Sequence, residues 1–156
     1  MYKLLILIKL LVLLPVLPIL GANALYGKGR GHFLDADIDW SADDIEICFM
    51  DSADYALSID VDEDQVDLTD AGIVADGTTF LASKTSTLGV ADADDFTVST
   101  VSGDQFEYVV IYKDSGIDAT SWLIACIDTA TGLPCTPNGG DITVAWDAGA
   151  NKILKL

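Results

Sequence analysis

Carboxylates are the most plentiful side chains in this sequence that could do chemistry, and many of them fall into three short clusters. The clusters span residues 35–39, 60–64 and 92–95, and the first two begin like the aspartate-rich loop of an EF-hand. That loop needs Gly at its sixth position and a bidentate Glu at its twelfth. Counted from Asp60, those positions hold Gln65 and Ala71. The sequence therefore favours a solvated acidic face without a metal, and irregular calcium binding by one loop is the alternative.

No other residue pattern predicts catalysis. His32 is the only histidine, so no second imidazole is available for a transition-metal site, and no serine or cysteine lies in a recognisable nucleophile motif beside it. Residues 27–31 alternate glycine with Lys28 and Arg30, but they lack the G-x-G-x-x-G spacing of a phosphate-binding loop. Carboxylate pairs for glycoside hydrolysis are defined by their spatial separation, which a sequence does not give. We expect a protein that is not an enzyme and binds no cofactor.

The charge balance excludes two classes of partner. The chain has 25 Asp and Glu against 8 Lys and Arg, a formal net charge of −17. Nucleic acids and anionic membranes are bound chiefly through clustered Lys and Arg. We therefore expect protein partners, with no nucleic acid and no membrane in the mature form.

The cysteines and tryptophans are predicted to be structural. Cys48, Cys126 and Cys135 are odd in number, have no metal-ligand spacing, and lie in or beside apolar stretches, which favours reduced cysteines in the core. Trp122 and Trp146 lie in predicted apolar strands. Core or interface positions are therefore favoured over a carbohydrate-binding aromatic strip, which remains an alternative.

The first 21 residues differ from the rest of the chain. A short basic start is followed by a nearly continuous apolar run from Leu4 to Leu20, and Ala22-Asn23-Ala24 fits the small-residue rule for signal-peptide cleavage. A membrane span fits less well, because the run is short and contains Lys9 and two prolines. A start codon placed too far upstream is a third interpretation. We treat residues 1–21 as an apolar leader and residues 22–156 as one β domain.

Short β-branched and aromatic runs separated by turn residues dominate the remainder. A short helix is expected within residues 23–33, weakened by its glycines. Seven strands are expected, and the two that are apolar on both faces, 106–112 and 122–127, read as central strands. This pattern predicts an all-β antiparallel sandwich or barrel with a short N-terminal helix. The predicted strands span residues 45–50, 79–84, 96–101, 106–112, 122–127, 142–146 and 152–156.

Three stretches of the second half are specific enough to indicate a family. They are residues 110–114 (VIYKD), residues 123–125 with 127–134 (LIA and IDTATGLP) and residues 137–142 (PNGGDI). With further matching residues between Ala22 and Tyr55, the chain resembles a group of small tailed-bacteriophage and prophage proteins, uncharacterised or described as virion structural components. The resemblance covers nearly everything after Gly21. The group usually has Val or Tyr in place of Cys126 and Cys135, and a longer segment around residues 60–78.

The resemblance implies a particle component, such as a head decoration or cement protein or a tail-associated subunit. It also implies a protein that begins near Ala22, which favours the misplaced start codon over a signal peptide. The expected location is then the virion, after synthesis in the host cytoplasm, with capsid or tail proteins as partners and self-association into a homo-oligomer. The alternative is a secreted β-sandwich module that binds carbohydrate or calcium after signal-peptide removal.

Two segments are predicted to contact a partner. The N-terminal segment combines apolar residues with two positive charges on an otherwise negative protein, and the 131–140 loop is stiffened by prolines and turned by an Asn-Gly-Gly sequence. Internal packing of the first segment, and a plain surface loop for the second, are the alternatives. The predicted contact residues are Leu25, Tyr26, Lys28, Arg30, Phe33, Pro134, Pro137 and Asn138.

Overall fold

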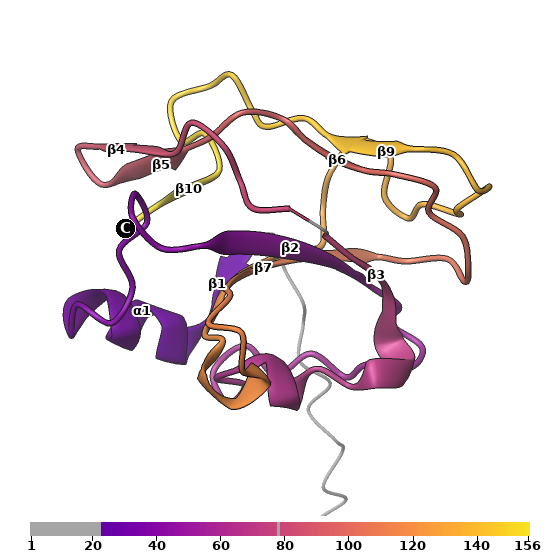
Figure 1. The fold of residues 1–156 in the computed structure, drawn as a ribbon, viewed down its shortest axis with the longest axis horizontal. Helices are drawn as coiled ribbons and strands as arrows, with labels where there is room; N and C mark the ends of the chain where they lie inside the picture. Colours follow the sequence, from indigo (N-terminus) through magenta and orange to yellow (C-terminus); the bar gives the residue numbers. More distant parts are fainter. Residues whose placement is uncertain (1–22, 78) are drawn as a thin grey trace, which may run out of the picture.

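Antiparallel strands dominate the computed structural model, which describes residues 23–77 and 79–156 (Figure 1). Within these ranges ten strands form a five-stranded sheet of order β1-β8-β7-β2-β3, a three-stranded sheet of order β10-β5-β4 and the pair β6-β9. The two smaller sheets form a second layer over one face of the large sheet. The large sheet stays open at β1 and β3, so the all-β prediction is confirmed as a sandwich-like fold and not a closed barrel.

The strands are β1 (Ala24–Leu25), β2 (Ile45–Met50), β3 (Ile73–Asp76), β4 (Thr85–Thr87), β5 (Val90–Asp92), β6 (Phe96–Val98), β7 (Tyr108–Lys113), β8 (Leu123–Ile127), β9 (Ile142–Val144) and β10 (Leu154–Lys155). The helix α1 spans Gly27–Leu34, and three 3₁₀ turns span η1 (Gln65–Asp67), η2 (Asp70–Gly72) and η3 (Asp118–Thr120).

The centre of the large sheet is buried on both faces. Every residue of β2 is buried, and β2 pairs antiparallel with β7 over its full length. Successive side chains of a strand point to opposite faces. Accordingly Ile45, Ile47 and Phe49 join the core between the two layers, whereas Cys48 and Met50 belong to a second core on the other face. The expectation that β7 and β8 are central strands is confirmed.

Residues 51–72 cover this second face, beneath the sheet as drawn in Figure 1. Tyr55, Leu57 and Leu68 from this segment pack with Tyr26, which precedes α1 and has no exposed surface. A segment without long strands or helices is thus fixed by a few large side chains. Its packing gives the large sheet a core on each side.

One predicted strand is wrong, and the strands on either side of it were not predicted. Residues 79–84 form no strand: Leu81 is buried and donates one backbone hydrogen bond to the Ile45 carbonyl at 2.8 Å, while the chain crosses from one layer to the other. The strands on either side of the crossing, β3 and the β4–β5 hairpin, were not predicted. The hairpin turns through Leu88 (φ 52°) and Gly89 (φ 78°), the positive-φ pair that fits the twist of a tight hairpin.

The predicted helix is confirmed but begins at Gly27, because Ala24 and Leu25 pair with β8 as the edge strand β1. The predicted leader, residues 1–21, lies outside the described residues. Among the residues described, the structure has no helix with the length and hydropathy needed to span a membrane.

Candidate functional site

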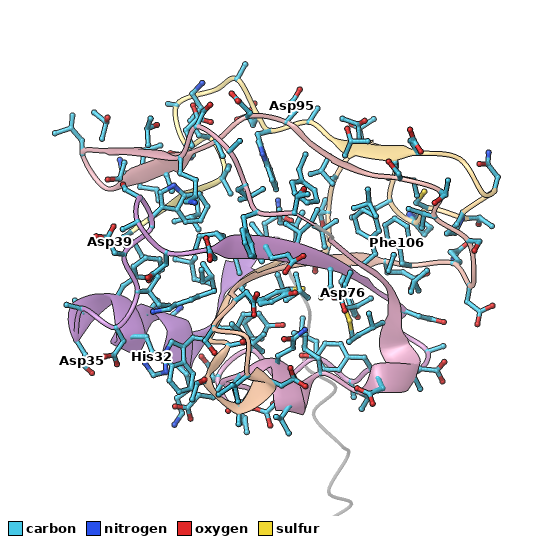
Figure 2. All side chains as sticks on the ribbon, in the orientation of Figure 1. His32, Asp35, Asp39, Asp76, Asp95 and Phe106 are labelled. Carbon is cyan, nitrogen blue, oxygen red and sulfur yellow. The ribbon has the colours of Figure 1, made fainter. Side chains whose placement is uncertain are left out.

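The three acidic clusters do not converge on one site. In Figure 2, Asp95 of the third cluster lies at the outer surface of the smaller sheets, far from Asp35 of the first cluster beside α1, whereas the first and second clusters approach each other at His32, which contacts Asp37 and Glu63. Within residues 23–77 and 79–156 no three His, Cys, Asp or Glu side chains are arranged to hold a metal ion. The carboxylates are therefore best understood from their local contacts.

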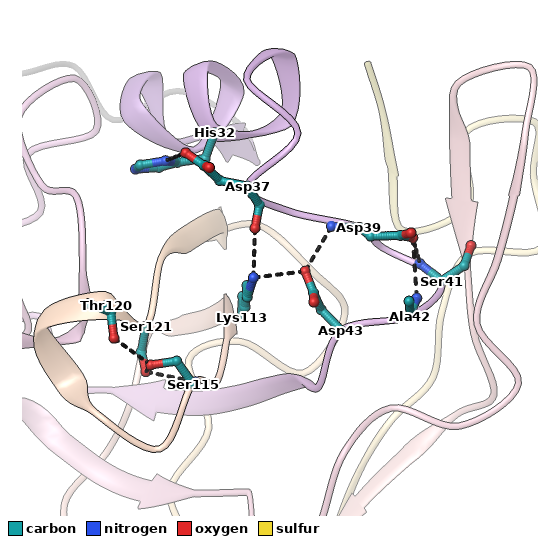
Figure 3. A network of polar contacts seen from close by, with 10 residues as sticks. All are labelled: His32, Asp37, Asp39, Ser41, Ala42, Asp43, Lys113, Ser115, Thr120 and Ser121. Atoms are coloured by element: carbon teal, nitrogen blue, oxygen red, sulfur yellow. Dashed lines mark hydrogen bonds and ion pairs between the residues drawn. The ribbon is translucent and has the colours of Figure 1, made fainter.

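In the first cluster the carboxylates hold turns together (Figure 3). The Asp39 carboxylate accepts hydrogen bonds from the backbone N–H groups of Ser41 and Ala42, at 2.9 and 3.2 Å. The Asp43 carboxylate accepts the Asp39 N–H and forms an ion pair with Lys113 at 3.0 Å. Lys113 also donates to the Asp37 carbonyl at 2.6 Å, which ties this loop to the end of β7. Such side-chain to backbone bonds are a common use of Asp in turns.

The other two clusters are used in the same way. Asp64 caps η1 by accepting the Val66 N–H, and the Asp67 carboxylate bonds back to the Asp64 backbone. The Asp94 carboxylate accepts a hydrogen bond from the Ser83 hydroxyl at 2.6 Å, and the Asp95 carboxylate accepts one from the backbone N–H of Trp146 at 3.0 Å. These carboxylates are surface groups that also fix loop geometry.

His32 lies between two carboxylates and against an indole. Its Nδ1 is 3.0 Å from Asp37 Oδ2 and its Nε2 is 3.3 Å from Glu63 Oε1. The imidazole stacks on Trp122, with centroids 4.2 Å apart and planes 10° apart. Lys28 contacts the same Glu63 carboxylate at 3.3 Å. His32 therefore fastens α1 to the segment that covers the sheet and to Trp122, which directly precedes β8, in agreement with a structural role.

A buried polar chain, not expected from the sequence, lies beneath the sheet. The Tyr55 hydroxyl donates to Asp62 Oδ2 at 2.5 Å, the Ser58 N–H donates to the same oxygen at 2.9 Å, and the Tyr26 hydroxyl is 3.3 Å from that of Tyr55. Burial raises the pKa of Asp62, although its hydrogen bonds oppose the shift. Burial raises the pKa of Tyr55 as well. The cluster connects the covering segment to the start of α1.

Asp62 and Asp60, two residues apart, give a test of this cluster. Asp62 is 9% exposed, whereas the side chain of Asp60 is 78% exposed. Asp62→Ala leaves the buried Tyr55 hydroxyl and the Ser58 N–H without their acceptor, so we expect a loss of about 2 kcal/mol in unfolding free energy. Asp60→Ala removes only an exposed ion-pair partner of Arg30 and should change stability by less than about 0.5 kcal/mol. Urea unfolding measures both, and equal effects would contradict a structural role for the buried carboxylate.

A second buried carboxylate lies within β2. Glu46 is 8% exposed, stands opposite Tyr112 in the β2–β7 pairing, and accepts the Tyr112 hydroxyl at 3.1 Å. Its pKa is raised to about 7, chiefly by burial and with a contribution from the nearby carboxylates of Asp114, Asp76 and Asp44, against the opposing Tyr112 hydrogen bond. Burial raises the pKa of Asp76 on β3 in the same way. The Glu46 and Asp76 carboxylates therefore lie on the same face of the large sheet, near its β3 edge.

The cysteines lie where unreactive thiols are expected. Cys48 and Cys126 are buried and free, and Cys135 is half-buried and free. Burial raises the pKa of both buried thiols, to about 12 in Cys126, so the nucleophilic thiolate is disfavoured.

The tryptophans pack against the core, as expected. Trp40 is buried, while Trp122 and Trp146 are partly buried against the same core. The indole N–H groups of Trp40 and Trp146 donate to the Asp92 and Asp94 carbonyls at 3.2 and 2.9 Å. An exposed aromatic strip for carbohydrate does not form from these residues.

The predicted contact residues are dispersed. Tyr26 is wholly buried, so it must be removed from the contact set, and Phe33 packs against the main core. Lys28 is exposed but contacts Glu63. Leu25 and Arg30 line a groove. The structure thus places Tyr26 and Phe33 against the cores, Leu25 and Arg30 at the groove, and Lys28 on the surface outside the groove lining.

The 131–140 loop lies at the other end of the molecule from α1 in Figure 1. Pro134 and Asn138 are exposed and Pro137 is half-buried. Backbone bonds join Cys135 to Phe106 and Gly139 to Val101, so the loop is attached along its length to the 101–106 segment. The two predicted contact regions therefore do not form one continuous surface.

A groove at the flank of the sandwich is lined by residues of both layers. It has a cavity volume of about 900 Å³ and runs between β1 with β8 on one side and the C-terminal residues 151–156 on the other. Volumes of this size are typical of ligand clefts. Apolar side chains of both layers form much of its wall, among them Leu25, Ile127 and Ile153.

No family model matches the chain, and no curated protein matches it closely enough to be significant.

Proposed function

We propose that this protein is a non-enzymatic structural subunit of a tailed-bacteriophage particle, attached to the exterior of the head or tail. The observation that carries the proposal is the groove at the open flank of the sandwich, where two sheet edges and an apolar wall offer a surface for another chain. The resemblance of residues 22–156 to phage particle proteins supports a phage particle as the assembly to which that surface binds.

The rest of the molecule suits such a role. The cores on both faces of the large sheet are built from apolar side chains of the chain itself. An acidic exterior limits adhesion between many copies on one particle and adhesion to packaged nucleic acid. Edge strands are also common sites of self-association, so we propose that the subunit acts as a homo-oligomer.

Mass spectrometry of purified particles tests the proposal. Particles from a phage that encodes this chain should be banded in a density gradient, and peptides from residues 23–156 should be found in the particle band at a constant ratio to the major capsid protein. A non-structural enzyme encoded by the same phage serves as the contamination control. Absence of this chain from the band, while it is present in the lysate, would overturn the proposal.

A further inference from the structure

The walls of the groove are edge strands from both layers of the sandwich. β1 is the last strand of the large sheet, and β10 is the last strand of the three-stranded sheet. Both line the groove, through Ala24 and Leu25 on one side and Leu154 and Lys155 on the other. An edge strand presents unpaired backbone groups that an extended segment can pair with. The Leu25 carbonyl of β1 already accepts a hydrogen bond from Arg30, so an added strand would pair with the other free backbone groups of these two edges.

Positive charge is concentrated at this groove. Lys28, Arg30, Lys84, Lys113, Lys152 and Lys155 are the cationic side chains of the described residues, and Arg30, Lys152 and Lys155 among them line the groove. Asp147 is the single Asp or Glu in the lining. The lining therefore carries more cations than carboxylates on a chain of net charge −17, although Arg30 and Lys152 each lie near an aspartate outside it, Asp60 and Asp92.

Two of these cations are held at the groove by contacts that leave them accessible. Arg30 donates to the Leu25 carbonyl at 3.2 Å, and its side chain is 53% exposed even though it lies 3.7 Å from Asp60. Lys152 lies 3.4 Å from Asp92 with 36% of its side chain exposed. Lys155, on β10, is exposed. Exposed ion pairs are weak, so a ligand carboxylate can compete for these cations.

We propose that the groove binds an extended acidic segment of a partner protein, which adds as a strand between β1 and β10 and places its carboxylates against Arg30, Lys152 and Lys155. This rests on the proposed function, since it names the chemistry of the partner through which the subunit attaches. Repulsion between the carboxylates of the segment and the rest of the acidic surface does not prevent binding, because at physiological salt charges more than about 8 Å apart are largely screened from each other.

Charge argues against the chain's own leader as the occupant. Residues 1–21 carry Lys3 and Lys9 and no carboxylate, so they do not complement a cationic groove. A second copy of the chain is the other possible occupant, and its binding would appear as a concentration-dependent change in mass.

The probe is a capped peptide of about seven residues that alternates Asp with Val, so that one face is acidic and the other apolar. Titrated into isotope-labelled protein, it should shift the amide resonances of β1, β10 and residues 151–153 and leave those of the 131–140 loop unchanged. A peptide that alternates Lys with Val should produce no shifts. Shifts elsewhere, binding of both peptides, or no binding of the acidic one would overturn the inference. In the last case, the lysines would serve only to keep the sheet edges from self-pairing.

A matched pair of variants separates local charge from net charge. Lys155→Gln should weaken the acidic peptide about fivefold and reduce the salt dependence of binding, whereas Lys84→Gln makes the same change in net charge outside the groove and should leave affinity unchanged. Equal affinities for the two variants would contradict the assignment. Sedimentation of the unliganded protein at rising concentration detects self-association. If the protein forms a dimer that Lys155→Gln weakens as it weakens peptide binding, the groove belongs to a second copy and the partner proposal is overturned.

Incorporation of the variants into particles distinguishes this inference from the proposed function. If the unmodified protein is found in particles and the Lys152→Gln, Lys155→Gln double variant is found there equally, the groove inference fails and the particle role stands. If the unmodified protein is absent from particles while the acidic peptide still binds as described, the particle role fails and the groove remains an acidic-peptide site. Loss of the double variant alone supports both.

Discussion

Gly29→Ala should lower the free energy of unfolding by about 3 kcal/mol, the largest single-residue effect we expect from an added methyl group. A Cβ at this position would lie 2.2 Å from the carbonyl oxygen of Leu123 and 3.3 Å from the Cα of Ile124. Both obstacles belong to the backbone of a central strand, so neither can rotate away. The helix α1 would have to move off β8 and weaken the contacts of His32 with Trp122 and Glu63.

Gly31→Ala is the matched control in the same helix. Apart from its chain neighbours and the backbone of the helix itself, no atom lies within 4 Å of a Cβ added there. Ala is favoured over Gly in a helix interior by about 1 kcal/mol, so this variant should be slightly more stable than the parent. Thermal unfolding followed by circular dichroism should show opposite shifts in Tm for the two variants. Shifts of the same sign would mean that helix propensity, not the approach of α1 to β8, controls this region.

The elements that could be predicted from sequence are those with a strong local signal. β2, β7 and β8 are continuous apolar runs bounded by Asp, Gly and Ser, and such runs indicate central strands. β3 was missed because a short run ending in Asp76 has no apolar alternation, and its pairing with β2 is set by long-range contacts. Residues 79–84 have the composition of a strand, but the segment crosses from one layer to the other and buries Leu81 between them.

The glycines of α1 show the same limit. Their helix-weakening effect was predictable from propensity, whereas the reason for Gly29 is visible only in the approach to Leu123. Similarly, Arg30 and Leu25 were predicted as contact residues, but Lys152 and Lys155 join them only because β10 returns to the same flank. Asp62 and Glu46 carried weak sequence signals: Glu46 is a lone carboxylate within an apolar strand, and Asp62 is indistinguishable from its neighbours.

Glu46→Gln should make the protein more stable at about pH 8 and change little at about pH 4. The folded state holds the Glu46 proton up to a pKa of about 7, against 4.5 for an ordinary Glu. The stability gained from that proton is complete below pH 4.5 and is lost as the pH rises through 7. Since one pKa unit corresponds to about 1.4 kcal/mol, the loss in the parent approaches about 3 kcal/mol. A neutral Gln can still accept the hydrogen bond from the Tyr112 hydroxyl and does not ionise, so the variant avoids this loss of stability.

Glu107→Gln is the control of opposite sign. Burial is the largest single influence and raises the pKa of Glu107, but hydrogen bonds from the Ser52 backbone and from the Gln105 and Ser52 side chains together outweigh it, so the pKa is lowered. Its contribution is present above the unfolded pKa and lost as the pH falls, so this variant should be less stable than the parent at neutral pH. Urea unfolding between about pH 4 and pH 8 measures both. Asp62 and Asp76 have raised pKa values, so Glu46→Gln should reduce the fall in stability with pH without abolishing it. An unchanged pH dependence in Glu46→Gln would mean that the carboxylate ionises in the folded state without cost, because water reaches it at the edge of β2.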